Sequence, residues 1–109
     1  MFELTKVTPT SSGPTVSISS SSVSNGGTTT ASVHTFNFVT SESTTDFDGS
    51  DVTVTGGIVG TMTGSGTNYS ISFTVFGVGT KTIEVQAGAF TNSSGTINQA
   101  SATYSFLKT

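Results

Sequence analysis

Residues 45–66 read TDFDGSDVTVTGGIVGTMTGSG, residues 69–75 read YSISFTV, and residues 79–96 read GTKTIEVQAGAFTNSSGT. Apolar and polar residues alternate within these runs, and glycine, serine and asparagine separate one run from the next. Successive side chains of a β-strand point to opposite faces, so each alternating run predicts a half-buried strand. The clearest run places Tyr69, Ile71, Phe73 and Val75 on one face, with Ser70, Ser72 and Thr74 facing water. The three runs together predict an all-β fold.

The same pattern extends outward in both directions along the chain. It predicts strands within residues 14–19, 32–39, 51–55, 58–62 and 80–86, and a last strand near the C-terminus. The residues expected to share one face of their strand are Val16 and Ile18; His34, Phe36 and Phe38; Val52 and Val54; Lys81, Ile83 and Val85; and Ala102, Tyr104 and Phe106. Phe36 and Phe38 are the first candidates for the core.

Glycine-containing segments predict the connections. Residues 20–30 (SSSVSNGGTTT) indicate a polar loop. The pair Gly56-Gly57 supplies the positive φ angles that a hairpin between residues 51–55 and 58–62 requires, and residues 64–66 predict another turn. Strands separated by such short turns are typical of a β-sandwich or barrel.

Length and composition limit the classes of protein to consider. The chain has 109 residues, which is enough for one domain with a two-layer core. Its 23 threonines and 19 serines, with only two leucines, favour strands over helices. Three lysines, no arginine and six acidic residues give a net charge of -3, so we expect no nucleic-acid partner. Cysteine is absent, which excludes disulfides and cysteine-bound zinc.

Three segments carry a resemblance to a known family: the aromatic strand HTFNFVTSE (34–42), the turn and strand FDGSDVTV (47–54), and GTKTIEVQAGAFT (79–91). They resemble bacterial immunoglobulin-like repeats. The resemblance implies an immunoglobulin-like, two-sheet antiparallel β-sandwich of about seven strands over residues 14–109, with residues 1–13 as an N-terminal arm. The cysteines and tryptophan of antibody-type domains are absent.

The resemblance also implies a function without catalysis, because such repeats act as rods, spacers and adhesive modules on cell surfaces and are displayed on phage capsids, tails and fibres. We expect a small virion surface protein, either a capsid decoration protein or a fibre or tail protein. The alternative is a single repeat of a secreted bacterial adhesin at the cell surface. A sandwich of this kind hosts many functions, so the fold alone does not choose between them.

The N-terminal sequence bears on localisation. It contains no apolar run of signal-peptide length, and no segment of the chain has the roughly 20 apolar residues that span a bilayer. If Met1 is the native start, we expect a chain that is not exported by the usual route and does not insert into a membrane. This favours the virion over the adhesin.

Three aspartates around Gly49 form a candidate metal site. Asp46, Asp48 and Asp51 bring hard oxygen ligands to one turn, which suits Ca²⁺. The bidentate glutamate that closes an EF-hand loop is missing. The alternative, which we favour, is that these side chains accept hydrogen bonds from nearby backbone amides and stabilise the turn without a cofactor.

Catalytic groups are not evident. His34 is the only histidine, and its place beside Phe36 and Phe38 predicts a packing residue with one polar contact. No G-x-S-x-G motif is present. We therefore expect no enzymatic activity.

Four apolar residues are candidates for partner binding. Phe2 and Leu4 alternate with Glu3 and Thr5, so this segment is a candidate arm against a neighbouring subunit or, equally, an edge strand of its own domain. Phe76 and Val78 lie in a predicted turn, where apolar side chains mark contacts when they cluster.

The partners we expect are protein subunits of a capsid or tail, with a homo-oligomer or a host-surface glycan or protein as further candidates. Carbohydrate-binding modules of this fold are disfavoured, because tryptophan is absent and Tyr69 and Tyr104 fall on predicted core faces.

Overall fold

The computed structural model describes residues 13–109, so Phe2 and Leu4 lie outside the described residues. Residues 13–109 form eight strands and one short 3₁₀ helix at Gly49–Asp51. The strands are β1 (Val16–Ser19), β2 (Thr28–Thr29), β3 (Val33–Thr44), β4 (Val52–Thr55), β5 (Gly57–Val59), β6 (Thr63–Val75), β7 (Gly79–Val85) and β8 (Tyr104–Lys108).

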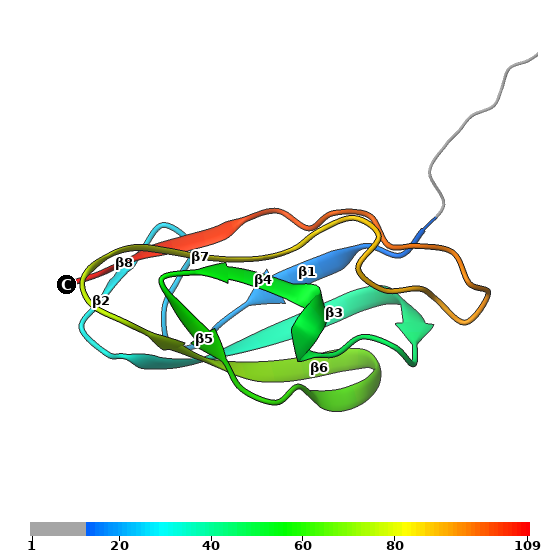
Figure 1. The fold of residues 1–109 in the computed structure, drawn as a ribbon, viewed down its shortest axis with the longest axis horizontal. Helices are drawn as coiled ribbons and strands as arrows, with labels where there is room; N and C mark the ends of the chain where they lie inside the picture. Colours follow the sequence, from blue (N-terminus) through cyan, green and yellow to red (C-terminus); the bar gives the residue numbers. More distant parts are fainter. Residues whose placement is uncertain (1–12) are drawn as a thin grey trace, which may run out of the picture.

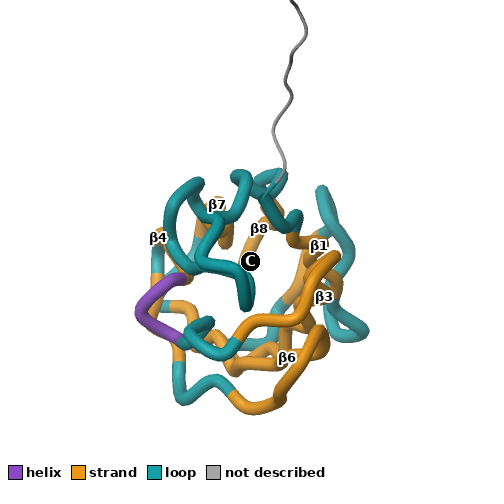
Figure 2. Tube along the Cα trace, turned by 90° about the vertical axis from the view of Figure 1, so that its right-hand side faces the viewer, coloured by secondary structure: helices purple, strands orange, loops and turns teal. Residues whose placement is uncertain are grey.

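The strands form two four-stranded sheets, ordered β1-β3-β6-β5 and β2-β8-β7-β4. Neighbouring strands are antiparallel except β2 and β8, which are parallel. Figure 2 looks along the sandwich and shows β4, β7 and β8 on one side and β1, β3 and β6 on the other. Taken in chain order, the first sheet has the A-B-E-D order of an immunoglobulin domain and the second adds β2 beside G-F-C. The predicted immunoglobulin-like sandwich is confirmed.

The predicted alternation sets the core. Phe36, Phe38, Phe73, Ile83 and Val85 are almost fully buried between the sheets, as their period-two positions predicted. Ser72, between the buried Ile71 and Phe73, is exposed. Apolar burial of this kind is the main stabilising term for a domain without disulfides.

Aromatic rings fill the core in two groups. Phe36 lies at the centre of one, with ring centroids 5.2 Å from Tyr104, 5.9 Å from Phe106 and 6.0 Å from Phe73. Phe47 lies at the centre of the other, 4.6 Å from Phe90, 5.2 Å from Tyr69 and 5.5 Å from Phe38. Most of these pairs are tilted or edge-to-face, the arrangement that aromatic quadrupoles favour. Phe47 comes from the β3–β4 connection, so that loop contributes to the core.

The sandwich is elongated, with principal extents of 58 × 27 × 19 Å. Residue 13 and the C-terminus lie at opposite ends of the long axis (Figure 1). We call these the Gly13 end, which carries the long β7–β8 loop, and the Thr109 end, which carries the β6–β7 turn. The two ends are therefore separate surfaces at opposite ends of the long axis.

The prediction of a hairpin at Gly56-Gly57 is wrong. β4 pairs with β7 and β5 pairs with β6, so this glycine pair carries the chain from one sheet to the other. Gly56 has φ +84°, which turns the chain. A Cβ on Gly57 would lie 2.2 Å from the Thr74 carbonyl oxygen, so glycine is what allows β5 to lie against β6.

Three further predictions need correction. Residues 20–30 are not only a loop, because they contain β2 and the buried Val23. Ala102 is exposed and precedes β8, so only Tyr104 and Phe106 of that group face the core. The turn at residues 64–66 lies inside the bounds of β6, whose first residues fold back so that Thr63 Oγ1 lies 3.0 Å from Ser70 Oγ.

Candidate functional site at the two ends of the sandwich

Exposed apolar side chains gather at the Thr109 end. Phe76 and Val78 in the β6–β7 turn have exposed fractions of 57% and 73%. Val33 on β3 and Ile58 on β5 are also exposed and lie opposite Thr74 of β6 in the sheet register, so they flank it on the outer face. The structure thus shows two further exposed apolar residues, Val33 and Ile58, at the same end as Phe76 and Val78. Val33 alternates with the inward-facing His34 and so faces outward, but nothing in the sequence predicts that it lies beside Ile58.

Lys81 lies just beneath this surface. Its side chain is 4% exposed and its ammonium nitrogen donates a hydrogen bond to the Phe76 carbonyl oxygen at 2.5 Å. A Cβ on Gly56 would lie 2.4 Å from Lys81 Cδ, so the glycine makes room for the methylene stem. Lysine covers apolar surface with its stem in this way and carries its charge toward the end of the core. The β6–β7 turn is thereby attached to β7.

Asp46 joins two loops at the Gly13 end. Its carboxylate accepts hydrogen bonds from the Thr44 hydroxyl at 2.7 Å, from the Thr91 amide at 3.0 Å and from the Thr91 hydroxyl at 2.7 Å. These bonds, led by those from the Thr91 and Thr44 hydroxyls, hold the pKa of Asp46 below its usual value of 3.8. Nearby, Asn92 donates to the Glu42 carboxylate at 2.7 Å. Asp46 therefore fastens the β3–β4 connection, and Glu42 the end of β3, to the β7–β8 loop.

Lowering the pH tests this connection. A depressed carboxylate pKa adds stability above the unfolded-state value, about 3.9, and that stability is lost as pH falls through the lower folded-state value. We expect the wild-type chain to exceed Asp46→Asn in free energy of unfolding by a constant amount between about pH 5 and 7, with the gap closing below about pH 4. Urea unfolding across this range measures it. A gap that does not change with pH would contradict the role given to the carboxylate.

Asp48 and Asp51 cap the 3₁₀ helix at Gly49–Asp51. The Asp48 carboxylate accepts from the Ser50 amide at 2.9 Å, and the Asp51 carboxylate accepts from the Asp48 amide at 2.9 Å, which forms a capping box. Partial burial raises the pKa of Asp51, and the negative charges of Asp48 and Asp46 add to it.

The same aspartates were the candidate calcium ligands. In residues 13–109, no three acidic or histidine side chains meet in a group that could hold a metal ion. The Asp46 carboxylate instead accepts a hydrogen bond from the Thr91 amide, whereas the carboxylates of Asp48 and Asp51 accept hydrogen bonds from backbone amides of their own turn. Calcium binding stays a prediction from the sequence.

Asn98 organises the β7–β8 loop from within. It is 2% exposed, its side-chain oxygen accepts from the Phe90 amide at 2.9 Å, and its side-chain nitrogen donates to the Gln86 and Gln99 carbonyl oxygens at 3.0 and 2.9 Å. All of its amide groups thus have partners, as a buried polar side chain requires. No signal in the sequence TINQA (96–100) distinguishes this asparagine from the others.

A mostly apolar hollow of about 400 Å³ opens beside this loop, where residue 13 enters the domain. Ala87, Ile97 and Ala100 contribute to its lining, and Ile97 is 58% exposed. Gly13 packs directly on Ile97, because a Cβ on Gly13 would overlap the Ile97 carbonyl oxygen. The Gln99 side chain and amide donate to the Gly13 and Pro14 carbonyl oxygens at 2.9 and 2.8 Å. The hollow is therefore held between two segments far apart in sequence.

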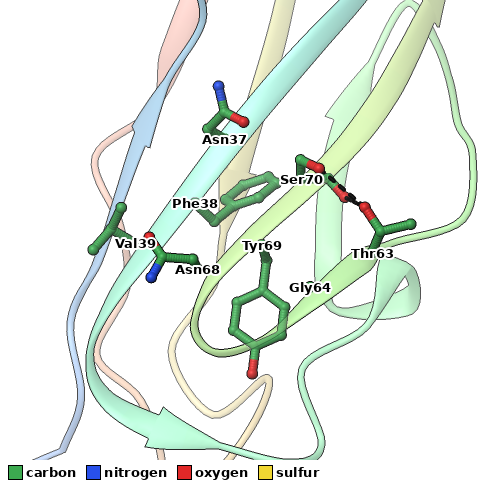
Figure 3. Close-up of a pocket in the computed structure, with 8 residues that line it drawn as sticks. All are labelled: Asn37, Phe38, Val39, Thr63, Gly64, Asn68, Tyr69 and Ser70. Carbon is green, nitrogen blue, oxygen red and sulfur yellow. Dashed lines mark hydrogen bonds between the residues drawn. The ribbon is translucent and has the colours of Figure 1, made fainter.

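A second hollow, of about 270 Å³, lies on the outer face of the first sheet between β3 and β6 (Figure 3). Asn37, Val39, Asn68 and Ser70 are among its lining residues, and it includes the bonded pair Thr63 and Ser70. No acidic or basic side chain lines it. It follows from the place where β6 folds back, and we assign it no chemistry.

His34 is a packing residue, as its position predicted. Its Nε2 atom donates to the Ala31 carbonyl oxygen at 3.0 Å, so its Nδ1 atom accepts from the Ser22 hydroxyl at 3.0 Å. The ring also packs edge-on against Phe106, with centroids 5.3 Å apart. Two polar contacts are found where one was expected.

Both tyrosines are buried, and the hydroxyl group of each donates hydrogen bonds to backbone carbonyl oxygens. The Tyr69 hydroxyl donates to the Thr44 and Gly66 carbonyl oxygens at 2.8 and 3.0 Å, and the Tyr104 hydroxyl to that of Val23 at 2.5 Å. Burial raises the pKa of Tyr69 and that of Tyr104. Neither ring forms a surface platform for sugars, as their predicted core positions implied.

Comparison with known proteins identifies one family. A family model described as "Bacterial Ig-like domain" matches residues 10–107. No curated protein and no solved structure matches the chain. Within residues 13–109, no helix is long and apolar enough to span a membrane.

Proposed function

Because this chain belongs to the bacterial Ig-like domain family, we propose that it is a non-enzymatic structural module that holds or displays other parts of a surface assembly. The observation that carries this proposal is the placement of residue 13 and the C-terminus at opposite ends of an elongated body (Figure 1). A module attached at one end projects its other end about 58 Å away. Its rigidity comes from two sheets packed through the aromatic core.

We place this module on a virion, as a capsid decoration, tail or fibre component. Copy number then supplies binding strength, because many weak attachments on one particle act together. The alternative setting is a repeat of a secreted bacterial adhesin, which the opposite ends also favour, since chain entry and exit at opposite ends suit a spacer. Host-surface glycans or proteins are the outward partners in either setting.

Labelling with an antibody against the folded chain distinguishes the two settings. We expect the label on purified phage particles from the source culture, visible by electron microscopy, with little on the surface of intact cells. Label confined to the cell surface or to long surface proteins would support the adhesin and contradict the virion assignment.

Removal of residues 1–10 tests the proposed attachment. If the arm binds a partner, we expect the truncated chain to fold with an unchanged urea midpoint but to lose incorporation into particles. The exchange Phe2→Ser with Leu4→Ser should have the same effect, because burial of two large apolar side chains contributes roughly 3–6 kcal/mol.

Exchange of the intervening residues, Glu3→Gln with Thr5→Ser, is the matched control and should leave incorporation intact. Full incorporation of the truncated chain would contradict attachment through this arm. A fall in the urea midpoint would instead support the other interpretation, in which residues 1–10 pair with their own domain.

A further inference from the structure

One asparagine of the chain directly precedes a glycine. Asn25 is followed by Gly26, whereas the other asparagines precede serine, glutamine or an aromatic residue. Asn25 and Gly26 lie in the loop between β1 and β2, and both are exposed. The backbone nitrogen that follows an asparagine can attack the side-chain amide carbon, and glycine obstructs this approach least because it has no Cβ. The chain therefore carries its most reactive asparagine on the surface.

The folded loop holds both reacting groups against β8. The Gly26 amide donates a hydrogen bond to the Ser105 carbonyl oxygen at 2.7 Å, and the Asn25 side-chain oxygen accepts one from the Ser105 amide at 2.9 Å. Attack requires an amide nitrogen that can lose its proton and a side chain that can turn its Cγ atom over that nitrogen. The two bonds to Ser105 oppose both steps. Asn25 is therefore protected while these bonds persist.

Two more backbone hydrogen bonds decide how often this protection is lost. The Leu107 amide donates to the Gly27 carbonyl oxygen and the Thr109 amide to the Thr29 carbonyl oxygen, each at 2.9 Å. β2 has only two residues and is an edge strand of its sheet. Segments held by few hydrogen bonds open at a lower free energy than the core, without unfolding of the whole domain. We therefore expect residues 25–29 to open from β8 repeatedly in the folded protein.

We propose that Asn25 is a modification site, at which the opening of residues 25–29 from β8 allows deamidation. The Gly26 nitrogen forms a bond to Asn25 Cγ, and the Cγ–Nδ2 bond breaks. Nδ2 leaves as ammonia with the proton of the Gly26 amide, and a succinimide ring remains. Water then opens the ring at either of its carbonyl groups, which gives aspartate or isoaspartate. Water is the only co-reactant.

The two products differ in what they do to β2. Aspartate keeps an acceptor for the Ser105 amide, so the segment can bind β8 again. Isoaspartate runs the main chain through the side-chain methylene group, which displaces Gly26 and Gly27 from their partners on β8. A transient opening thus becomes a permanent release of β2. This modification goes beyond the proposed structural function, which holds whether or not Asn25 is modified.

Peptide mapping by mass spectrometry tests the proposal on the full chain in mildly alkaline buffer. We expect conversion of Asn25 to be at least about tenfold slower in the folded chain than in the chain unfolded by urea. Urea added below the unfolding transition should speed the conversion, because it favours local opening. Equal rates in the folded and unfolded chains would overturn protection by Ser105. No conversion of the folded chain, even with this urea added, would overturn modification through local opening.

A proline at position 107 isolates the opening step. Leu107→Pro removes the amide that donates to Gly27 but leaves the bonds between β7 and β8, because alternate residues of β8 face β7. We expect severalfold faster conversion of Asn25 in this folded variant. Leu107→Ala keeps the amide and is the matched control, which should convert as the wild type does. Equal rates for the two variants would contradict the role of opening, and the urea series decides if Leu107→Pro does not fold.

Hydrogen exchange on the isoaspartate product, separated by ion exchange, tests the release of β2. Three amides that bond to residues 25–29 should lose protection: those of Ser105, Leu107 and Thr109. The intervening amides of Phe106 and Lys108 face β7 and should keep it. Asn25→Asp is the matched control and should keep all five protected. Unchanged protection in the isoaspartate product, or loss at all five amides, would overturn a selective release of β2.

Discussion

Phe36→Ala should lower the free energy of unfolding by about 3–5 kcal/mol, the usual cost of truncating a phenylalanine in a packed core. Phe36 is fully buried and packs on three other aromatic rings from both sheets, so the cavity cannot close by movement of a single strand. Domains of this size have total stabilities of roughly 5–15 kcal/mol, so a large fraction of the Phe36→Ala molecules is expected to unfold at low urea concentration. Urea unfolding followed by near-ultraviolet circular dichroism measures the loss.

Phe76→Ala is the matched control, because it removes the same atoms from a side chain that is 57% exposed. Its effect on unfolding should stay within about 0.5 kcal/mol at a concentration where the chain is monomeric. Similar losses for the two variants would mean that the aromatic group around Phe36 does not hold the sheets together.

Asn98→Ala should lower the free energy of unfolding by about 2–4 kcal/mol, because it leaves the buried Phe90 amide and the partly buried Gln86 carbonyl without these partners. The effect should be largest in the β7–β8 loop. Hydrogen exchange is therefore expected to show lost protection at the Phe90 amide before the strands themselves open.

Two substitutions control for this result. Asn92→Ala removes the hydrogen bonds that Asn92 makes with the Ser94 amide, the Thr96 amide and the Glu42 carboxylate. These bonds lie at exposed or partly exposed sites where water replaces them, so the loss should stay at about 0.5–1 kcal/mol. Asn98→Asp keeps an acceptor for the Phe90 amide but removes both donors, and should cost at least as much as Asn98→Ala. A well-tolerated Asn98→Asp variant would show that the donated bonds are unimportant.

Alternation predicted which residues of the central strands face inward, because every second residue lies on the same face and the apolar set identifies the buried one. It therefore identified Phe36, Phe73 and Ile83, and it also placed Lys81 inward despite its charge. The apolar Phe76 and Val78 were recognised from a turn position. Each of these predictions depends only on residues close together in the sequence.

The predictions that failed depended on contacts between distant segments. A glycine pair serves a hairpin or a passage between sheets equally well, and only the pairing of β4 with β7 decides which. Two further features were not predicted. The hollow at the Gly13 end forms where the β7–β8 loop packs on residue 13, and Asn98 accepts a hydrogen bond from the Phe90 amide within that loop. The sequence contains no local pattern for these contacts.

The parallel pairing of β2 with β8 affects how the domain responds to mechanical pulling. Backbone hydrogen bonds join Gly26 to Ser105, Leu107 to Gly27, and Thr109 to Thr29. A load applied between residue 13 and Thr109 draws β2 and β8 lengthwise in opposite directions, so these bonds are loaded together in shear instead of one after another. Resistance to stretching along the axis that joins its two ends is thus built into a strand of only two residues and its flanking loop.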